Sequence, residues 1–486
     1  MWKYISNIIT GYPESLIYSS DSEQTTYTYS EVLEKAKAHG DKLSKVIKPG
    51  NKCAIMCISE FNTAIAILAA WCAGLIPIPL SKNYGEQHCR SILDLCQPQV
   101  IICDDAGEQY DYPNASIYNF AYSCFANTID NNTSERELSD IALIMCTSGT
   151  TGRPKGILLT KEGLINNIAG ICRYFLITNE DTILIVRPLY HSAVMTGEFL
   201  TSLVKGTNIV FCDQQYSPNK VVEYINKYNV SVMCATPTLY RHLSQILAMS
   251  NENVNIKSIV MSGECLTNNT AHTVRKSFPH SKIYNVYGLT EASPRVSYLP
   301  PEQFDSHPGS VGIPLSDTEI KIISQEGALC SHNQHGMIYV KSNSLMKGYY
   351  HNQELTDKVL VNGWLRTGDI GYKDNEGYLY IMSRSDYMII KGGMNIYPQE
   401  IEIIIQKLDQ VDECMAYAIN RGDLCSIGLD VVINKEYYPE VTVKNLKESI
   451  ADILPKYLLP SIVHIVDKLP KNASGKILRP KYDYRK

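Results

Sequence analysis

The sequence has 486 residues, of which 44% are hydrophobic and 20% are charged, as in an ordinary globular protein. One hydrophobic core organises roughly 250–300 residues, so a chain of this length is expected to form two or more domains. The net charge of −5 and the absence of any block of basic residues argue against a nucleic-acid-binding face.

The 15 cysteines are scattered along the chain without a C-x-x-C pair, which argues against a zinc ribbon or a thioredoxin-type redox pair. Their pattern fits reduced, mostly buried thiols in a cytoplasmic protein. The first ten residues lack the apolar core of a signal peptide. The most apolar stretch, residues 64–80, contains Gly74, Pro77 and Pro79, so it predicts a buried helix ending near Gly74 and then a short strand. We therefore expect a soluble, intracellular protein without a membrane span.

Strand and helix patterns alternate through the first 290 residues, which predicts an α/β fold with layered, largely parallel sheets. Helices are expected at residues 64–73 and 219–227. Strands are expected at residues 53–58, 100–103, 141–146, 157–159, 183–186, 209–212, 230–234 and 259–261.

Beyond these elements the pattern changes twice. Residues 309–382 show short strands and turns, for example at 318–323 and 336–340, which predicts a small β subdomain. The last hundred residues have their own helix patterns at 398–408 and 443–454, and strands near Ala416 and Val431. We expect an N-terminal domain of residues 1–385, which includes the β subdomain, and a small α+β C-terminal domain of residues 386–486.

A hydroxyl-rich loop, residues 147–156, connects the expected strands 141–146 and 157–159. Its glycines let the backbone fold around an anion, its hydroxyls donate to phosphate oxygens, and its lysine supplies positive charge. It is not a Walker loop, because Pro154 stands where that motif has its second glycine. The loop therefore predicts a site for nucleotide phosphates, formed by Thr147, Ser148, Gly149, Thr150, Thr151, Gly152 and Lys155.

Residues 285–292 follow a probable strand at 282–283, and ligands of open α/β sheets bind beyond strand ends. Glu291 could hold a magnesium ion, a hard cation that prefers carboxylate and phosphate oxygens. Tyr287 offers a flat face to a purine, and Asn285 offers an amide to its exocyclic amine. Alone, this segment also fits a turn followed by a helix cap.

Three segments nearer the C-terminus add further polar groups. Asp369 is expected in a tight turn flanked by glycines, where its carboxylate could accept hydrogen bonds from both ribose hydroxyls, although an ordinary Asp turn would look the same. Arg384 could reach the same ribose. Lys476 is expected on a flexible turn, where a lysine is normally just solvated.

These five segments, in this order over nearly the whole chain, resemble the acyl-adenylate-forming superfamily, which comprises acyl- and aryl-CoA ligases, adenylation domains of peptide synthetases, and luciferases. The resemblance implies that the loop 147–156 holds the β- and γ-phosphates of ATP, and that Thr290 and Glu291 serve the α-phosphate and Mg²⁺. It implies that Asp369 and Arg384 bind the ribose, and that Lys476 reaches the α-phosphate and the substrate carboxylate. The other residues that it implies in nucleotide binding are Gly263, Glu264, Cys265, Asn285, Tyr287 and Gly288.

The resemblance also implies a two-step reaction. A carboxylate attacks the α-phosphorus of ATP, expels pyrophosphate and forms an acyl-AMP, which a thiol then converts into a thioester. Between the steps a mobile C-terminal domain rotates about a hinge residue, here Asp386, so that Lys391, Gly392 and Gly393 line the approach of the thiol. The chain departs from the family pattern at Met337 and Ser383, which we interpret as local packing changes.

The segment 188–195 carries the best indication of the acid. His191 stands where amino-acid-activating relatives have an aspartate, and no carboxylate lies between Arg187 and Gly197. A buried ammonium without a partner costs several kcal/mol, so an α-amino acid is disfavoured. The alternative for His191 is a packed core histidine. We expect a mainly apolar pocket for an aryl or medium-sized acyl group, formed by His191, Val194, Met195, Val286 and Ala292.

Two hypotheses remain for the thiol. The first is a ligase that uses coenzyme A, together with ATP and Mg²⁺, and we favour it. The second is a stand-alone adenylation enzyme that loads the phosphopantetheine arm of an acyl carrier protein, since the sequence ends ten residues after Lys476 without a fused carrier domain. A non-catalytic relative is a distant third, because every chemical position is filled.

Overall fold

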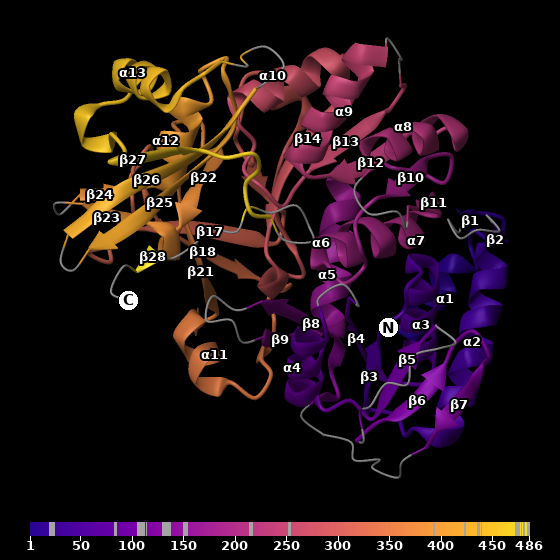
Figure 1. Cartoon of the computed structure of the whole chain (residues 1–486). Coiled ribbons are helices and arrows are strands. Elements are labelled where there is room, and N and C mark those ends of the chain that lie inside the picture. Colours follow the sequence, from indigo (N-terminus) through magenta and orange to yellow (C-terminus); the bar gives the residue numbers. More distant parts are fainter. Residues whose placement is uncertain are drawn as a thin grey trace.

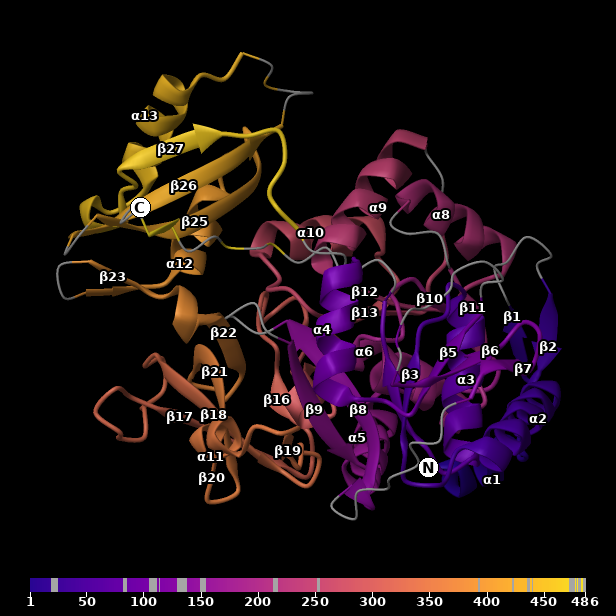
Figure 2. The ribbon, with the colours of Figure 1, turned by 60° about the horizontal axis from the view of Figure 1, so that its bottom comes forward.

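The structure is a computed structural model, and it describes residues 1–18, 25–81, 85–104, 112, 114–128, 138–148, 154–212, 217–250, 254–391, 394–421, 424–434, 438, 440–471, 477, 479 and 482–483. A large N-terminal part and a smaller C-terminal part lie side by side in Figures 1 and 2. No helix among these residues is long and apolar enough to cross a membrane.

The largest sheet has nine strands in the order β16-β15-β14-β13-β12-β10-β11-β1-β2. Its six inner strands, from β14 to β1, are parallel, and β15, β16 and β2 join antiparallel at the two ends. The strands are β1 (Leu16–Tyr18), β2 (Thr26–Thr28), β10 (Thr182–Ile185), β11 (Asn208–Phe211), β12 (Val232–Ala235), β13 (Ser258–Met261), β14 (Lys282–Gly288), β15 (Arg295–Leu299) and β16 (Ile313–Pro314).

A second sheet, in the order β4-β3-β5-β6-β7, is parallel except for its last strand. It comprises β3 (Lys52–Ile55), β4 (Ile76–Pro79), β5 (Val100–Cys103), β6 (Ser116–Asn119) and β7 (Cys124–Asn127). One buried core contains residues of this sheet, of the nine-stranded sheet and of helix α3 (Glu60–Cys72), so the two sheets form layers around shared helices. Helix α3 is buried on most of its surface, as its nearly continuous apolar sequence requires.

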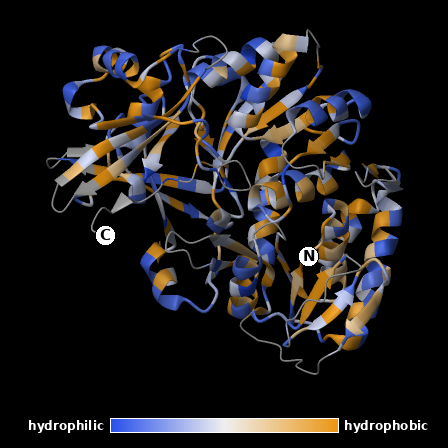
Figure 3. Ribbon diagram, viewed as in Figure 1, coloured by the Kyte–Doolittle hydropathy of each residue, from blue (hydrophilic) through white to orange (hydrophobic). Residues whose placement is uncertain are grey.

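The remaining helices of the N-terminal part cover the sheets. Figure 3 shows hydrophobic residues gathered along the inner strands, whereas the outer helices also carry polar residues. These helices are α1 (Trp2–Ile9), α2 (Tyr29–Val46), α4 (Glu86–Cys96), α5 (Lys161–Tyr174), α6 (Ser192–Val194), α7 (Thr201–Lys205), α8 (Pro218–Lys227), α9 (Pro237–Ser250) and α10 (Asn268–Ser277).

Two antiparallel sheets complete the N-terminal part. The first has the order β19-β9-β8, formed by β8 (Ile141–Ser148), β9 (Pro154–Thr160) and β19 (Gly348–Tyr349). The second is the small β subdomain, in which β22 pairs with β21. Its elements are β17 (Thr318–Ile323), β18 (Gly336–Ser342), α11 (Gln353–Val359), β20 (Leu360–Val361), β21 (Trp364–Lys373) and β22 (Leu379–Arg384).

The C-terminal part has a hydrophobic core of its own. Its main sheet has the order β27-β26-β25-β28, beside the hairpin β23-β24. The elements are β23 (Ile389–Lys391), β24 (Met394–Ile396), α12 (Pro398–Ile405), β25 (Val411–Arg421), β26 (Leu424–Ile433), α13 (Val443–Ile453), β27 (Ile462–Ile465) and β28 (Tyr482–Asp483). The predicted fold class, layered α/β sheets with a β subdomain and a small α+β unit, is confirmed.

Candidate active site

Strand β14 brings one group of predicted residues into the sheet. Asn285 is 1% exposed, and its amide nitrogen donates to the carbonyl of Ser310 at 2.7 Å. The sequence had indicated a strand end near residue 283, but β14 continues to Gly288 because antiparallel pairing with β15 extends it. A Cβ on Gly288 would lie 2.2 Å from the carbonyl oxygen of Pro294, so this position has room for glycine alone. A 3-10 turn, Thr290–Ala292, follows directly.

The carboxylate of Asp369 links β14 with the β subdomain. Its Oδ2 accepts a hydrogen bond from the hydroxyl of Tyr287 at 2.5 Å, and its Oδ1 pairs with the guanidinium of Arg384 at 3.1 Å. Burial, and secondly the charge of Asp369, raises the pKa of Tyr287 well above its usual value, so this hydroxyl stays a donor. Each carboxylate oxygen has two lone pairs, so Asp369 can still accept a hydrogen bond from a ligand at each oxygen.

The predicted turn at Asp369 is wrong. The residue lies inside strand β21, opposite Arg384 of β22. Gly368 adopts a φ of +77°, and the register shifts just after Asp369, between Ile370 and Gly371. The irregularity re-aims the strand without ending it, which is a common role of such bulges near functional sites.

Glu291 lies beside the end of the predicted phosphate loop. Its Oε1 accepts a hydrogen bond from the hydroxyl of Tyr349 at 2.8 Å, and the ammonium of Lys155 lies 5.5 Å from the centre of the same ring. Strands β8 and β9 pair up to Ser148 and Pro154, with Thr147 opposite Lys155. Residues 149–153, which include the predicted Gly149, Thr150, Thr151 and Gly152, lie outside the described residues. Lys155 and Glu291 therefore both contact the side chain of Tyr349.

The predicted acid pocket adjoins this group. The hydroxyl of Ser192 lies 3.0 Å from that of Thr290. Burial, and secondly the nearby charge of Arg187, lowers the pKa of His191 to about 3, so the imidazole is neutral at physiological pH. Its Nε2 has no hydrogen-bond partner among the described residues. The apolar residues expected around it are all buried: Val194, Met195, Val286 and Ala292.

The segment predicted to face adenine follows strand β13. Gly263 has a φ of +92°, a conformation that side chains rarely adopt. The Oε2 of Glu264 accepts hydrogen bonds from the hydroxyl of Thr238 at 2.7 Å and from its backbone amide at 3.2 Å. Burial raises the pKa of Glu264. Cys265 is exposed and contacts the amide of Gln399 from the C-terminal part at 2.9 Å.

Comparisons with known proteins identify the family of the chain. The AMP-binding enzyme profile matches residues 8–350, and that of the AMP-binding enzyme C-terminal domain matches residues 400–476. The chain belongs to the AMP-binding enzyme family. It is 28% identical to the 2-succinylbenzoate–CoA ligase of Bacillus subtilis, over 96% of this chain and 93% of the relative. Identity to the Bacillus pumilus ligase is 33%, over 71% of this chain and 68% of the relative.

A solved structure of a family member has the same fold. The O-succinylbenzoate coenzyme A synthetase of Bacillus subtilis, in complex with ATP and a magnesium ion, superposes with a TM-score of 0.85 at 27% identity, over 98% of each chain. The same enzyme has been solved with its acyl-adenylate intermediate, again with a TM-score of 0.85. The predicted enzyme class is confirmed: this member of the AMP-binding family is an AMP-forming acid–thiol ligase, which activates a carboxylic acid with ATP.

Sequence reasoning missed a buried charged cluster in this AMP-binding enzyme. Arg187 pairs with Glu198 at 2.6 Å and donates to the hydroxyl of Ser262 at 3.1 Å. A Cβ on Gly197 would lie 2.8 Å from a guanidinium nitrogen of Arg295, which is 5% exposed. Glu198 lies in a π-helix, Met195–Leu200, a rare element that is frequent at functional sites. The segment that follows His191 therefore carries a buried charged group as well as buried apolar ones.

Of the predicted hinge and thiol residues, the structure describes Asp386 and Lys391. Asp386 is exposed in the 3-10 turn Ser385–Tyr387, between β22 and β23. The ammonium of Lys391 donates to the carbonyl of Tyr457 at 3.0 Å, within the C-terminal part. Gly392, Gly393 and Lys476 lie outside the described residues. Of the two departures from the family pattern, Ser383 is buried and its hydroxyl contacts the carbonyl of Arg384 at 3.0 Å.

Proposed function

We propose that this enzyme activates an aryl carboxylic acid and transfers the acyl group to coenzyme A. The contact between Ser192 and Thr290 carries the proposal, because it joins the acid pocket to the predicted α-phosphate site. A carboxylate in that pocket can approach the α-phosphorus of ATP. The curated relatives in Bacillus, which the chain matches over most of its length, are CoA ligases of an aryl acid.

The proposed chemistry needs positive charge rather than a base. The substrate carboxylate is already ionised, so no group has to remove a proton before its oxygen attacks the α-phosphorus. Lys155 stands at the end of the loop proposed to hold the β- and γ-phosphates, and Lys476 is proposed to stabilise the α-phosphate while the carboxylate attacks. Asp369 and Arg384 are proposed to hold the ribose, which restricts the position of the phosphates attached to it.

Glu291 is the residue proposed to hold Mg²⁺. Its carboxylate has one oxygen engaged by Tyr349 and offers the hard oxygen donors that Mg²⁺ prefers in combination with phosphate oxygens. When bound, the ion would supply positive charge against the phosphates and the departing pyrophosphate.

The charged cluster of Arg187, Glu198 and Arg295 narrows the chemical class of the proposed acid. Arg187 and Arg295 carry two positive charges, and Glu198 carries one negative charge, so the cluster has an excess of one positive charge. The Nε atoms of both arginines and the Oε2 of Glu198 have no hydrogen-bond partner among the described residues. An aryl acid with a second anionic group, as in 2-succinylbenzoate, would suit this cluster better than a plain fatty acid. An α-amino acid stays disfavoured, because its ammonium would meet a cluster that already has an excess of positive charge.

The domain boundary is part of this proposal. We place it at Asp386, between β22 and β23, with residues 386–486 as the mobile domain. Rotation there would exchange the side of the C-terminal domain that faces the nucleotide, so that Lys391, Gly392 and Gly393 line the thiol's approach.

An ATP–pyrophosphate exchange screen tests the proposal. The acids would be 2-succinylbenzoate, benzoate, medium-chain fatty acids and the proteinogenic amino acids. An aryl acid should exceed every amino acid by at least about tenfold, or about 1.4 kcal/mol of discrimination. The best acid is then offered with free CoA or with a phosphopantetheinylated carrier protein, and CoA should accept the acyl group. An amino acid at the top of the screen would refute the proposed pocket, and acylation of the carrier alone would refute CoA as the acceptor.

A further inference from the structure

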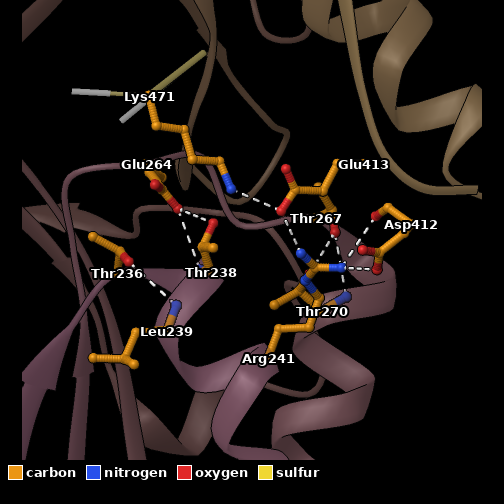
Figure 4. A network of polar contacts seen from close by, with 10 residues as sticks. All are labelled: Thr236, Thr238, Leu239, Arg241, Glu264, Thr267, Thr270, Asp412, Glu413 and Lys471. Carbon is orange, nitrogen blue, oxygen red and sulfur yellow. Dashed lines mark hydrogen bonds and ion pairs between the residues drawn. The ribbon is translucent and has the colours of Figure 1, made fainter. Parts of the chain in front are cut away.

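An ionic cluster joins the two parts of the chain where α9 meets β25 (Figure 4). Arg241 of α9 donates through Nη1 to the carboxylate of Asp412 and, at 3.2 Å, to its carbonyl oxygen. Its Nη2 donates to the Oε1 of Glu413 at 2.6 Å. Lys471 donates to the same Oε1 at 2.8 Å. We call these four residues the interdomain cluster.

An irregularity in β25 makes the cluster possible. Consecutive side chains of a regular strand point to opposite faces, so two neighbouring carboxylates would not meet one cation. The pairing of β25 with β26 shifts register between Val411 and Glu413, which leaves Asp412 out of the ladder. This bulge turns both carboxylates toward α9. The planar guanidinium of Arg241 can serve both at once, whereas a lysine offers a single charged centre.

The cluster is neutral and largely shielded from water. Its two cations balance its two anions, and the side chains of Arg241 and Glu413 are 15% and 14% exposed. Partly buried pairs are screened by salt less than surface pairs. Loss of Arg241 would leave Glu413 with Lys471 alone and would remove the cation that pairs with Asp412. An unpaired charge in a partly buried place is unfavourable. The cluster therefore stabilises the observed placement of β25 against α9.

Lys471 connects the cluster to the candidate active site. It pairs with Ile477 through an antiparallel bridge, so the cluster fixes the chain on either side of residues 472–476. Lys476 immediately precedes Ile477. Lys471 also lies close enough to Glu264 for its charge to oppose the effect of burial on the pKa of that carboxyl. Arg241 thus contacts Glu413, Glu413 contacts Lys471, and Lys471 pairs with Ile477.

We propose that Arg241 is a positioning residue for the adenylation step. Through Glu413 and Lys471 it holds the C-terminal part in the orientation that presents Lys476 to the nucleotide. The inference rests on the proposed function of Lys476. Because Arg241 supports one orientation, its loss disfavours adenylation and leaves the thiol step, which uses another orientation, unharmed.

The test compares the two half-reactions in the full chain. Arg241→Gln should lower pyrophosphate exchange at least about fivefold and leave thioester formation from supplied acyl-adenylate and CoA within about twofold, as expected for a shifted two-state equilibrium. Arg241→Glu, which repels both carboxylates, should lower exchange further, and Arg241→Lys should restore part of it. The matched control is Arg275→Gln, since Arg275 pairs with Asp305 inside the N-terminal part. Exchange at the wild-type level in Arg241→Gln, or equal loss of both half-reactions, would overturn the proposal.

A second measurement separates this inference from the proposed function. Chemical unfolding of Arg241→Gln, Glu413→Gln and the double variant needs no substrate, and the two substitutions should be non-additive because the side chains are in contact. If the two substitutions change the free energy of unfolding additively, the proposed coupling of Arg241 with Glu413 is refuted, even if the enzyme is active. If the effects on stability are non-additive but the wild-type protein exchanges pyrophosphate with no acid, the cluster stands and the proposed function is refuted.

Discussion

Replacing Asp369 with asparagine should weaken ATP binding while leaving the acid pocket intact. The substitution keeps the shape of the side chain and removes the charge that Tyr287 and Arg384 contact at 2.5 and 3.1 Å. It also puts an NH₂ group where one of these donors now points. A hydrogen bond to a charged group contributes about 1.5–3 kcal/mol, so loss of one ribose contact predicts ATP binding weaker by about 10- to 150-fold.

The assay is the KM for ATP in pyrophosphate exchange, supported by calorimetric titration of ATP without acid. The KM for the acid is the internal control, because the partners that the structure describes for the Asp369 carboxylate, Tyr287 and Arg384, are not residues of the expected acid pocket. Tyr287→Phe is the matched variant: it removes one donor to Asp369 but keeps the charge, so it should weaken ATP binding by only about fivefold, or about 1 kcal/mol. Unchanged ATP affinity in a folded Asp369→Asn protein, or a loss that falls on the acid instead, would refute the assignment of this carboxylate to the ribose.

Three further variants address the remaining residues. Lys476→Ala should lower adenylation by about 10²–10³-fold and spare thioester formation from supplied acyl-adenylate, whereas equal damage to both steps would count against its role. Asp386→Pro, which fixes φ near −65°, should spare pyrophosphate exchange and abolish overall thioester formation, and a full wild-type rate would place the hinge elsewhere. Burial lowers the pKa of His191 to about 3 from the model-compound value of 6.5, so the unfolded chain binds a proton here that the folded chain does not, and stability is lost as the pH falls from 6.5 toward 3. His191→Gln should flatten this part of the pH dependence in chemical denaturation, and an unchanged slope would contradict the buried, neutral imidazole.

Much of the fold follows from local pattern. Strand β17 occupies the expected residues 318–323, and helix α8 begins one residue before the expected 219, because Pro218 suits the first turn of a helix. Apolar runs bounded by glycine and polar residues define such elements without help from the rest of the chain. Local pattern failed at Asp369, where glycines suggested a turn. Pairing with β18 and β22 keeps the chain extended there, and that pairing involves residues far away in sequence.

The site was predictable where one segment carries several polar groups. Thr290 and Glu291 stand in one motif. The structure brings that motif to Ser192 and, through Tyr349, to Lys155. Tyr349 gave no such signal, since it contacts Glu291 from 58 residues away and no motif surrounds it. Arg295 likewise lies beside Gly197 through folding alone. An isolated charged residue in a sequence is usually a solvated one, so only the structure shows that these are buried.

Buried polar atoms in the segment that follows His191 indicate a site for a polar ligand. Thr196 and Glu198 are at most 1% exposed, yet the Oγ1 of the former and the Oε2 of the latter have no hydrogen-bond partner among the described residues. Buried polar groups without partners are costly, by about 1–3 kcal/mol each, and are rare unless a ligand or water completes them. The interdomain cluster, in contrast, has its charges paired within the protein. We therefore propose that selection of the acid and orientation of the C-terminal domain depend on different residues. Variants of the pocket should change which acid reacts, and variants of Arg241 should change which half-reaction is favoured.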